Sequence, residues 1–335
     1  MKLLLLLNIL SIAAFNLPTI FKEWYCIGFE KNIDKTKPYK FNVGDLPMVS
    51  WFDKNNNTLS MIDICPHMGT KLSLGHISKN GNLVCPNHKL EYTQKNVFGE
   101  TMIYQDKLWW SYEPSEIKPP TMALYNNKKY ESILMEVIVN SNVIDCLTNI
   151  MNINSFNNPL GYKLNIEPSN INKYKYSYDN YGILFDYILK TNLNKSLKLS
   201  ENFFYFKYPL TFWYRNSIKL REKSKLEHEN IFMNINCLPI NIDKTKWYII
   251  VYYNNYDNSS IKKQAIKKAI SEMILNNINI LANKAEFTLL KKNILSHTKM
   301  LINDDQELYN LFKMYNYPDI QSAVNLYNYH RMKNI

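Results

Sequence analysis

The chain has 335 residues and 46% of them are hydrophobic, so it is long enough for two domains and can bury a substantial core. This composition excludes an intrinsically disordered chain. The 40 Lys and Arg residues exceed the 29 Asp and Glu residues and give a formal charge of +11, but without a block of like charges, which argues against a nucleic-acid-binding arm.

The N-terminal segment, residues 1–20, starts with the charged Lys2 and continues as an apolar run broken by Asn8 and Ser11. This pattern is typical of a secretory signal, and the run is shorter than the roughly 20 apolar residues of a membrane span. We expect a signal or a membrane anchor, and hence a secretory or membrane-associated protein. A buried or membrane-resting helix is the alternative.

Short, partly alternating apolar runs separated by polar turns fill the chain up to Tyr112, which predicts strands. The predicted strands are 48–53, 59–64, 82–86 and 107–113. Three prolines between Pro114 and Pro120 indicate a linker. We therefore divide the folded chain into a first domain over 22–117 and a second over 118–335.

The second region contains both strand-like alternation and helix-like periodicity of apolar residues. Residues 130–152 predict a strand running into a helix, and alternating aromatic and aliphatic residues predict further strands. The apolar positions of 261–281 repeat as on an amphipathic helix. The further predicted strands are 202–215 and 246–254, and 303–315 predict the start of another helix.

Two Cys and two His gather in one short stretch, although the whole chain has only 5 Cys and 6 His. Each pair follows a strand-like run and includes a Pro, and the pairs read Cys65-x-His67 and Cys85-x-x-His88. Two thiolates and two imidazoles suit a tetrahedral zinc ion, and they also suit a [2Fe–2S] cluster in which two His replace two Cys on one iron. A zinc finger usually places two His on one helix, whereas here each pair mixes one Cys with one His.

The other Cys and His residues form no second group in the sequence. Free thiols in the core, rather than a disulfide framework, are expected for three widely separated cysteines, Cys26, Cys146 and Cys237. His76 lies between the two pairs and is expected either at the surface or in contact with one of the ligands. His228 stands in a charged stretch and His330 near the end of the chain.

The two pairs resemble the Rieske motif. "CPHMG" followed by "CPNH" is similar to the Cys-x-His and Cys-x-x-His of Rieske oxygenases, and "TKLSLG" matches their Leu-Ser-x-Gly segment. The resemblance implies a [2Fe–2S] cluster in which Cys65 and Cys85 bind one iron. His67 and His88 would bind the other.

One departure from the family pattern lies at the second pair. Relatives commonly read Tyr-His-Gly-Trp there, whereas this chain keeps the His but surrounds it with Asn87, Lys89 and Leu90. The additional disulfide cysteines of respiratory-chain Rieske proteins are missing from the motif. This favours the oxygenase branch, in which the cluster passes electrons to a second iron.

The resemblance extends to the second domain. "CLPINIDKTKWYIIVYYN", residues 237–254, is similar to a strand pair in the catalytic domain of the group that contains pheophorbide a oxygenase, and "NDDQELY" is similar to its acidic helix. The implied fold class is α+β. A small antiparallel β Rieske domain is followed by a helix-grip-like domain, in which an antiparallel sheet wraps a long helix.

The family's second iron is a mononuclear Fe(II) held by two His and one carboxylate. The two His belong to a helical pattern, Asn-x-x-Asp-x-x-His-x-x-x-x-His. Asn142 and Asp145 match it, and Asp145 takes the position that the resemblance assigns to electron relay. Thr148 and Ile153 stand where the two His belong, and neither can replace an imidazole.

A residual carboxylate ligand for that iron is Asp305 or its neighbour Asp304, and His297 lies nearby in the sequence. One carboxylate does not make the triad of ligands. We therefore expect no mononuclear iron at this place.

The sequence thus favours a Rieske protein that transfers electrons and lacks the oxygen-activating iron. An active monooxygenase or desaturase on a hydrophobic ring substrate is one alternative, and a zinc-stabilised interaction protein is another. The implied partners are an electron donor (a reductase or a ferredoxin), a hydrophobic small molecule, a membrane at the N-terminus and a second copy of the chain. The Lys excess can attract an acidic donor protein or an anionic membrane, but the codon bias of an AT-rich genome is the better explanation of it.

Overall fold

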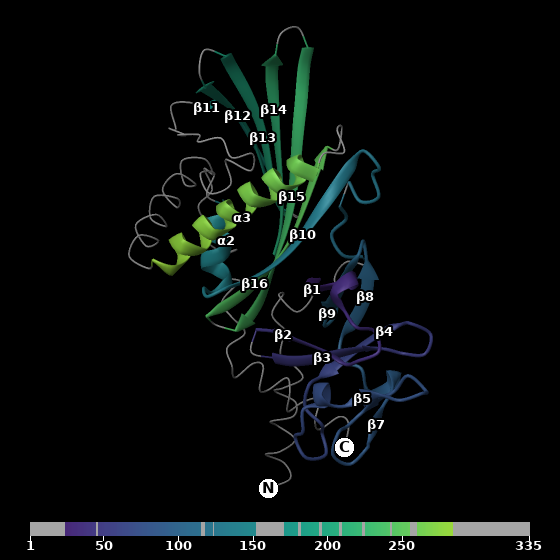
Figure 1. The fold of residues 1–335 in the computed structure, drawn as a ribbon. Helices are drawn as coiled ribbons and strands as arrows, with labels where there is room; N and C mark the ends of the chain where they lie inside the picture. The colour runs from purple at the N-terminus through teal and green to yellow at the C-terminus, as the bar shows by residue number, and fades with distance from the viewer. Residues whose placement is uncertain are drawn as a thin grey trace.

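The computed structural model describes residues 24–44, 46–114, 118–122, 124–151, 171–179, 182–193, 196–207, 210–222, 225–241, 243–254 and 260–283. Within these ranges, small antiparallel sheets form the N-terminal part of the molecule. One large antiparallel sheet with two helices forms the rest (Figure 1).

The N-terminal part contains three three-stranded sheets. Their strands are β1 (Tyr25–Phe29), β9 (Lys107–Ser111) and β8 (Glu100–Tyr104); β2 (Tyr39–Val43), β3 (Leu46–Phe52) and β4 (Thr58–Ile62); and β5 (His76–Ile77), β6 (Leu83–Val84) and β7 (Glu91–Tyr92). Short 3₁₀ helices lie between them, η2 (Glu30–Asn32), η3 (Leu72–Leu74) and η4 (Gln94–Asn96). The β5–β6–β7 sheet lies at the end remote from the large sheet (Figure 1).

The β3–β4 hairpin shows how local chemistry sets these strands. Its turn is polar, and the carboxylate of Asp53 accepts hydrogen bonds from the backbone N–H groups of Asn55 and Asn57, each at 2.8 Å. Asn56 takes a positive φ of 64°, a conformation that Asn adopts more readily than most residues. Trp51 is fully buried on β3, and its indole N–H donates to the Gly81 carbonyl at 3.2 Å.

The large sheet has seven strands in the order β10-β16-β15-β14-β13-β12-β11, and every neighbouring pair is antiparallel. The chain from β11 to β16 is a meander of consecutive hairpins, and β10 completes the far edge. The strands are β10 (Tyr130–Val139), β11 (Ile171–Asp179), β12 (Gly182–Leu193), β13 (Ser196–Lys207), β14 (Thr211–Glu222), β15 (Lys225–Asn241) and β16 (Lys244–Asn254).

Two helices lie against this sheet, α2 (Val143–Met151) and α3 (Ser260–Ala282) (Figure 1). α3 buries Ile266, Ile270 and Ile274, which recur at helical spacing on its inner face. The two helices also contact each other through a buried amide pair, because Asn149 Nδ2 donates to Asn277 Oδ1 at 2.7 Å.

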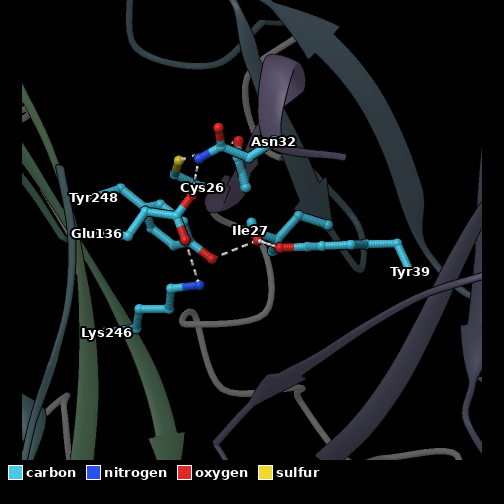
Figure 2. A network of polar contacts seen from close by, with 8 residues as sticks. Cys26, Ile27, Asn32, Tyr39, Glu136, Lys246 and Tyr248 are labelled. Atoms are coloured by element: carbon cyan, nitrogen blue, oxygen red, sulfur yellow. Dashed lines mark hydrogen bonds and ion pairs between the residues drawn. The ribbon is translucent and has the colours of Figure 1, made fainter. Parts of the chain in front are cut away.

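The first part docks on the large sheet through polar contacts as well as one continuous apolar core. Figure 2 shows the hydroxyl groups of Tyr39 and Tyr248 both donating to the carbonyl oxygen of Ile27. In the same view the carboxylate of Glu136 accepts from Asn32 Nδ2 and pairs with Lys246 Nζ, each at 2.8 Å. These contacts join strands that are far apart in the sequence.

Lys107 is a buried cation at this boundary that the sequence did not reveal. It is 1% exposed, and its Nζ donates to Asn234 Oδ1 at 2.6 Å and to Met122 Sδ at 3.4 Å. Burial lowers the pKa of Lys107 to about 8, although the nearby Cys26 acts in the opposite direction. Asn236 Nδ2 also donates to Asn234 Oδ1, at 2.8 Å, so a chain of buried polar groups continues into the sheet.

The expected fold class, a small antiparallel β domain followed by an α+β domain, is confirmed. The strand that runs into a helix is β10 followed by α2, and the amphipathic helix is α3. Cys26, Cys146 and Cys237 are buried free thiols, as expected. Residues 1–20 and the predicted helix over 303–315 lie outside the described residues, and no helix in the described part is long and apolar enough to span a membrane.

Candidate metal centre

Two loops of the same design carry the two Cys–His pairs. In the first loop the backbone N–H of Cys65 donates to the carbonyl of Thr70 at 2.7 Å, and in the second the N–H of Cys85 donates to the carbonyl of Leu90 at 2.9 Å. Each loop therefore closes over five residues in the same way. Each Cys-Pro therefore begins a loop that the same kind of backbone bond closes.

Both loops reverse direction at a residue in the left-handed region, four positions after the Cys. Gly69 has φ +72° in the first loop, and Lys89 has φ +57° in the second. Glycine adopts this conformation without cost, whereas a residue with a Cβ is strained there. The departure from the family's His-Gly at Lys89 is thus a substitution at a position where the backbone favours glycine. The Lys89 side chain folds back, and its Nζ donates to the Pro86 carbonyl at 2.9 Å.

Three contacts hold the loops to each other and to the domain. Asn87 Nδ2 donates to Thr70 Oγ1 at 2.9 Å and so links the second loop to the first. The buried carboxylate of Asp63 accepts from the Ser73 N–H at 2.6 Å and from its hydroxyl at 2.7 Å, which fixes the end of the first loop. At Gly75 a Cβ would lie 1.9 Å from the Val84 carbonyl, so only glycine allows this close approach beside the second loop.

The thiols lie inside this arrangement and the imidazoles outside. Cys65 and Cys85 are 1% and 0% exposed, and their side chains contact each other. His67 and His88 are exposed, and their ring centroids are 4.8 Å apart with the rings nearly perpendicular. The structure therefore places the four residues predicted as ligands in two close pairs, a buried thiol pair and an exposed imidazole pair.

Tyr92 is a neighbour of the thiols that the sequence did not single out. Its hydroxyl lies 3.0 Å from Cys65 Sγ. Burial raises the pKa of the Cys65 thiol, but hydrogen bonds from Tyr92 and from the backbone of His67 and Met68 outweigh burial, so the net pKa is lowered. Burial and the contact with Cys65 raise the pKa of Tyr92, so the phenol keeps its proton and can donate a hydrogen bond to the sulfur.

This environment fits a metal cluster bound through thiolates. The thiolate is the form of Cys that binds metal, and hydrogen bonds to the sulfur stabilise it. In the part of the chain that the structure describes, no three His, Cys, Asp or Glu side chains form a single group that could hold a metal ion. The separation into two pairs matches a two-iron cluster, in which each iron takes one pair.

The sequence pattern Asn142–Asp145 has a local explanation in the structure. Asn142 Nδ2 donates to Asp145 Oδ2, and the Asp145 N–H donates to Asn142 Oδ1, both at 2.8 Å. These reciprocal bonds begin α2 and satisfy N–H groups that a helix N-terminus leaves free. The role of Asp145 in electron relay stays a prediction.

The remaining predicted residues are placed as follows. His76 is exposed on β5, as expected. The backbone of Thr148 belongs to α2, whereas Ile153 follows the last described residue of that helix. The other candidate ligands of the second iron, His297, Asp304 and Asp305, lie outside the described residues. His330, near the end of the chain, also lies outside them.

Comparison with known proteins identifies the N-terminal part. Residues 23–101 match the family model of the Rieske [2Fe–2S] domain, so the chain contains such a domain. The chain is 33% identical over 67 residues to chloroplastic pheophorbide a oxygenase of Arabidopsis thaliana. It is 32% identical over 82 residues to the oxygenase component of 3-ketosteroid-9-alpha-monooxygenase of Rhodococcus rhodochrous. The matched segments are 20% and 24% of this chain and only 12% and 21% of those proteins.

Solved structures extend the likeness to the whole fold. Dicamba monooxygenase bound to dicamba superposes with a TM-score of 0.66 at 12% identity and covers 82% of this chain and 90% of its own. NdmA of Pseudomonas putida CBB5 with caffeine gives a TM-score of 0.58 at 16% identity, covering 77% and 82%. The fold is that of Rieske oxygenases, and the resemblance to the pheophorbide a oxygenase group predicted from the sequence is confirmed.

Proposed function

We propose that this protein binds a [2Fe–2S] cluster through Cys65, Cys85, His67 and His88 and uses it to transfer single electrons. The observation that carries the proposal is the sorting of the ligands, with two thiols in contact inside the domain and two imidazoles side by side at its surface. A bound cluster supplies a one-electron couple whose potential depends on its ligands and on hydrogen bonds to the sulfurs.

The chain's own residues have distinct roles in this proposal. Tyr92 donates a hydrogen bond to a ligand sulfur, and Asp63 fixes the end of the first loop through Ser73. The exposed edges of His67 and His88 give an electron a short route to a partner protein. The partner we propose is a reductase or a ferredoxin.

We also propose that the standard mononuclear iron is not held, because Thr148 and Ile153 occupy the positions of its two His ligands. An active monooxygenase is the second candidate function. It is supported by the fold, because the match to dicamba monooxygenase covers 82% of this chain and so extends beyond the Rieske domain. Dicamba and caffeine, the molecules named with the solved structures, are ring compounds. A hydrophobic ring compound is therefore the substrate class that this second candidate would take.

The test of the cluster is protein purified without air, with its visible spectrum, EPR signal, and iron and zinc content measured. We expect a coloured protein that dithionite bleaches, with a Rieske-type EPR signal. His88→Ala should destroy or alter that signal, whereas His76→Ala, the matched control on β5, should preserve it. A colourless protein with stoichiometric zinc would show that the site is a zinc centre instead.

The test of the second iron is anaerobic iron titration of the wild-type protein. We expect about two irons per chain, both in the cluster. The double variant Thr148→His/Ile153→His should gain a third iron if Asp304 or Asp305 supplies the carboxylate. A third iron already held tightly by the wild-type protein, and lost on replacing His297 or Asp305, would favour the monooxygenase.

A further inference from the structure

The hairpin turn between β8 and β9 has a backbone conformation that its residues do not favour. β8 ends at Tyr104 and β9 begins at Lys107, which faces Tyr104 in the sheet. Gln105 and Asp106 form the two-residue turn between them, with φ angles of 51° and 61°. Such turns are usually built from Asn-Gly or Asp-Gly, because most side chains are strained at positive φ. The fit to the turn therefore does not explain Gln105.

The side chain of Gln105 binds the backbone of a segment that follows Pro120. The Met122 N–H donates to Gln105 Oε1 at 2.6 Å, and Gln105 Nε2 donates to the Met122 carbonyl at 3.3 Å. One side-chain amide thus satisfies both backbone polar groups of one residue, as a neighbouring strand would.

The two neighbours of Gln105 contact the same segment. The hydroxyl groups of Tyr104 and Thr121 lie 2.9 Å apart. The Tyr125 hydroxyl donates to Asp106 Oδ1, also at 2.9 Å. Three consecutive residues therefore hold one segment by their side chains. We call residues 104–106 the hairpin tip, and we call the segment the strap, which consists of Thr121, Met122 and Tyr125.

Met122 carries the strap into the boundary between the two domains. It is 3% exposed, and its Sδ accepts hydrogen bonds from Lys107 Nζ at 3.4 Å and from the Tyr252 hydroxyl at 3.7 Å. Lys107 belongs to β9 of the first domain, whereas Tyr252 belongs to β16 of the large sheet. The strap therefore contacts both domains at once, beside the buried bond from Lys107 to Asn234.

We propose that the hairpin tip is a clasp that holds the strap in the domain boundary and thereby fixes the first domain on the large sheet. Gln105 and Asp106 act through their side chains, at positions where Asn and Gly would form a better turn. Opening of the clasp withdraws Met122 from the boundary, removes one acceptor from the Lys107 ammonium and lets water reach it.

The clasp acts on the placement of the first domain and not on the ligand loops. The hairpin tip contacts the boundary, whereas the β5–β6–β7 sheet lies at the end remote from the large sheet (Figure 1). The clasp would therefore act in the same way with or without a bound cluster. Incidental contacts at the tip are the alternative, and a better turn sequence would then leave the strap as firmly held as before.

The experiment compares full-length wild type with Gln105→Asn/Asp106→Gly, which has the preferred turn sequence but shortens one side chain and removes the other. Gln105→Ala removes a single side chain. Asn56→Gly is the matched control, because Asn56 has a φ of 64° in the β3–β4 turn, away from the strap. Hydrogen exchange at single amides and acetylation of lysines by acetic anhydride are followed by mass spectrometry.

We expect the Met122 N–H to exchange about fivefold to tenfold faster in both Gln105 variants, since each loses its hydrogen bond. The Glu30 N–H is an internal reference, because it donates to the backbone carbonyl of Asp106 at 2.9 Å and should stay within about twofold of wild type. Acetylation of Lys107 should be several-fold faster, whereas the exposed Lys79 should react as in wild type. The β8–β9 amides of the double variant should exchange no faster, because its turn is less strained.

Unchanged Met122 exchange and Lys107 acetylation in both Gln105 variants would overturn the clasp. Equal increases in Asn56→Gly would contradict it too, because they would report a general loosening of the protein. Faster exchange along β8 and β9 in the double variant would show that Gln105 and Asp106 stabilise the turn itself. If the double variant does not fold, Gln105→Ala decides the question alone. Neither measurement uses the cluster, so a colourless protein would refute the electron-transfer function and leave this test unchanged.

Discussion

At the scale of single residues, Tyr92 is the side chain most directly placed to adjust the redox centre. Its hydroxyl donates to Cys65 Sγ at 3.0 Å, and such a bond stabilises the more negative, reduced state. We predict that Tyr92→Phe lowers the reduction potential by on the order of 40–80 mV, which corresponds to roughly 1–2 kcal/mol for one electron. Protein-film voltammetry measures the shift. Tyr104→Phe is the control, because that hydroxyl pairs with Thr121 instead, and an equal shift in both variants would contradict the assignment.

Gly69 and Lys89 form a matched pair in the two ligand loops. Both have positive φ, and a Cβ at Gly69 would meet nothing within 4 Å, so Gly69→Ala tests backbone strain alone. We predict that Gly69→Ala destabilises the protein by about 1–2 kcal/mol, whereas Lys89→Gly stabilises it by about 0.5–1 kcal/mol. Urea denaturation of the cluster-loaded protein measures both. A destabilising Lys89→Gly would show that the bond from Lys89 to Pro86 outweighs the strain.

At the scale of elements, variants at the start of α2 can distinguish a structural role of Asp145 from a role in electron relay. Asn142 and Asp145 bond reciprocally at the helix N-terminus. We predict that Asn142→Ala lowers the free energy of unfolding by about 1 kcal/mol, as loss of a helix cap does. Asp145→Asn keeps an acceptor for Asn142 and should cost less. Slower reoxidation of the reduced protein in Asp145→Asn, at unchanged stability, would instead support the relay role.

The two ligand loops share one backbone arrangement. Each loop uses one backbone bond across five residues to place a Cys at its base and a His at its exposed side. The second loop keeps this backbone bond and a residue with positive φ, although Asn87, Lys89 and Leu90 depart from the family pattern.

At the scale of the whole molecule, Lys107 links the Rieske domain to the large sheet. A lysine with a lowered pKa binds fewer protons than the unfolded chain between about pH 8 and pH 10.5, so the stability of the protein should rise with pH across that window. We predict that Lys107→Met removes this rise, which is on the order of 3 kcal/mol, and stabilises the protein at pH 7. Asn234 keeps its bond from Asn236 in the variant.

Urea denaturation of wild type and Lys107→Met between pH 7 and about pH 10.5 measures the effect as a difference between the two proteins. The buried phenols and the thiols of Cys146 and Cys237 are common to both proteins and cancel in that difference. Cys26, which Lys107 affects, titrates above this window, because burial raises its pKa to about 12. Lys79→Met is the control, because that side chain is exposed. Parallel pH profiles for wild type and Lys107→Met would show that Lys107 does not titrate in this range.

The sequence by itself predicted the ligand set, and it determined the Rieske type of the first domain and the positions of several strands and of both described α-helices. Those features are local, since the spacing of two Cys–His pairs and the periodicity of apolar residues are written in neighbouring positions. It also showed Thr148 and Ile153 at the positions of the missing imidazoles. No local pattern singled out Tyr92, because its role depends on contact with a sulfur from another loop.

Only the tertiary structure showed which of the predicted ligands are buried. It also showed that Asn142 and Asp145 form hydrogen bonds with each other, and that Lys107 lies between two domains. Lys107 and Asn234 are far apart in the sequence and meet because β9 packs near β15 across the domain boundary. Likewise, Met68, Leu74 and Leu90 are apolar, and the fold leaves them exposed on or near the ligand loops. Burial and long-range pairing depend on the whole chain, and local composition does not encode them.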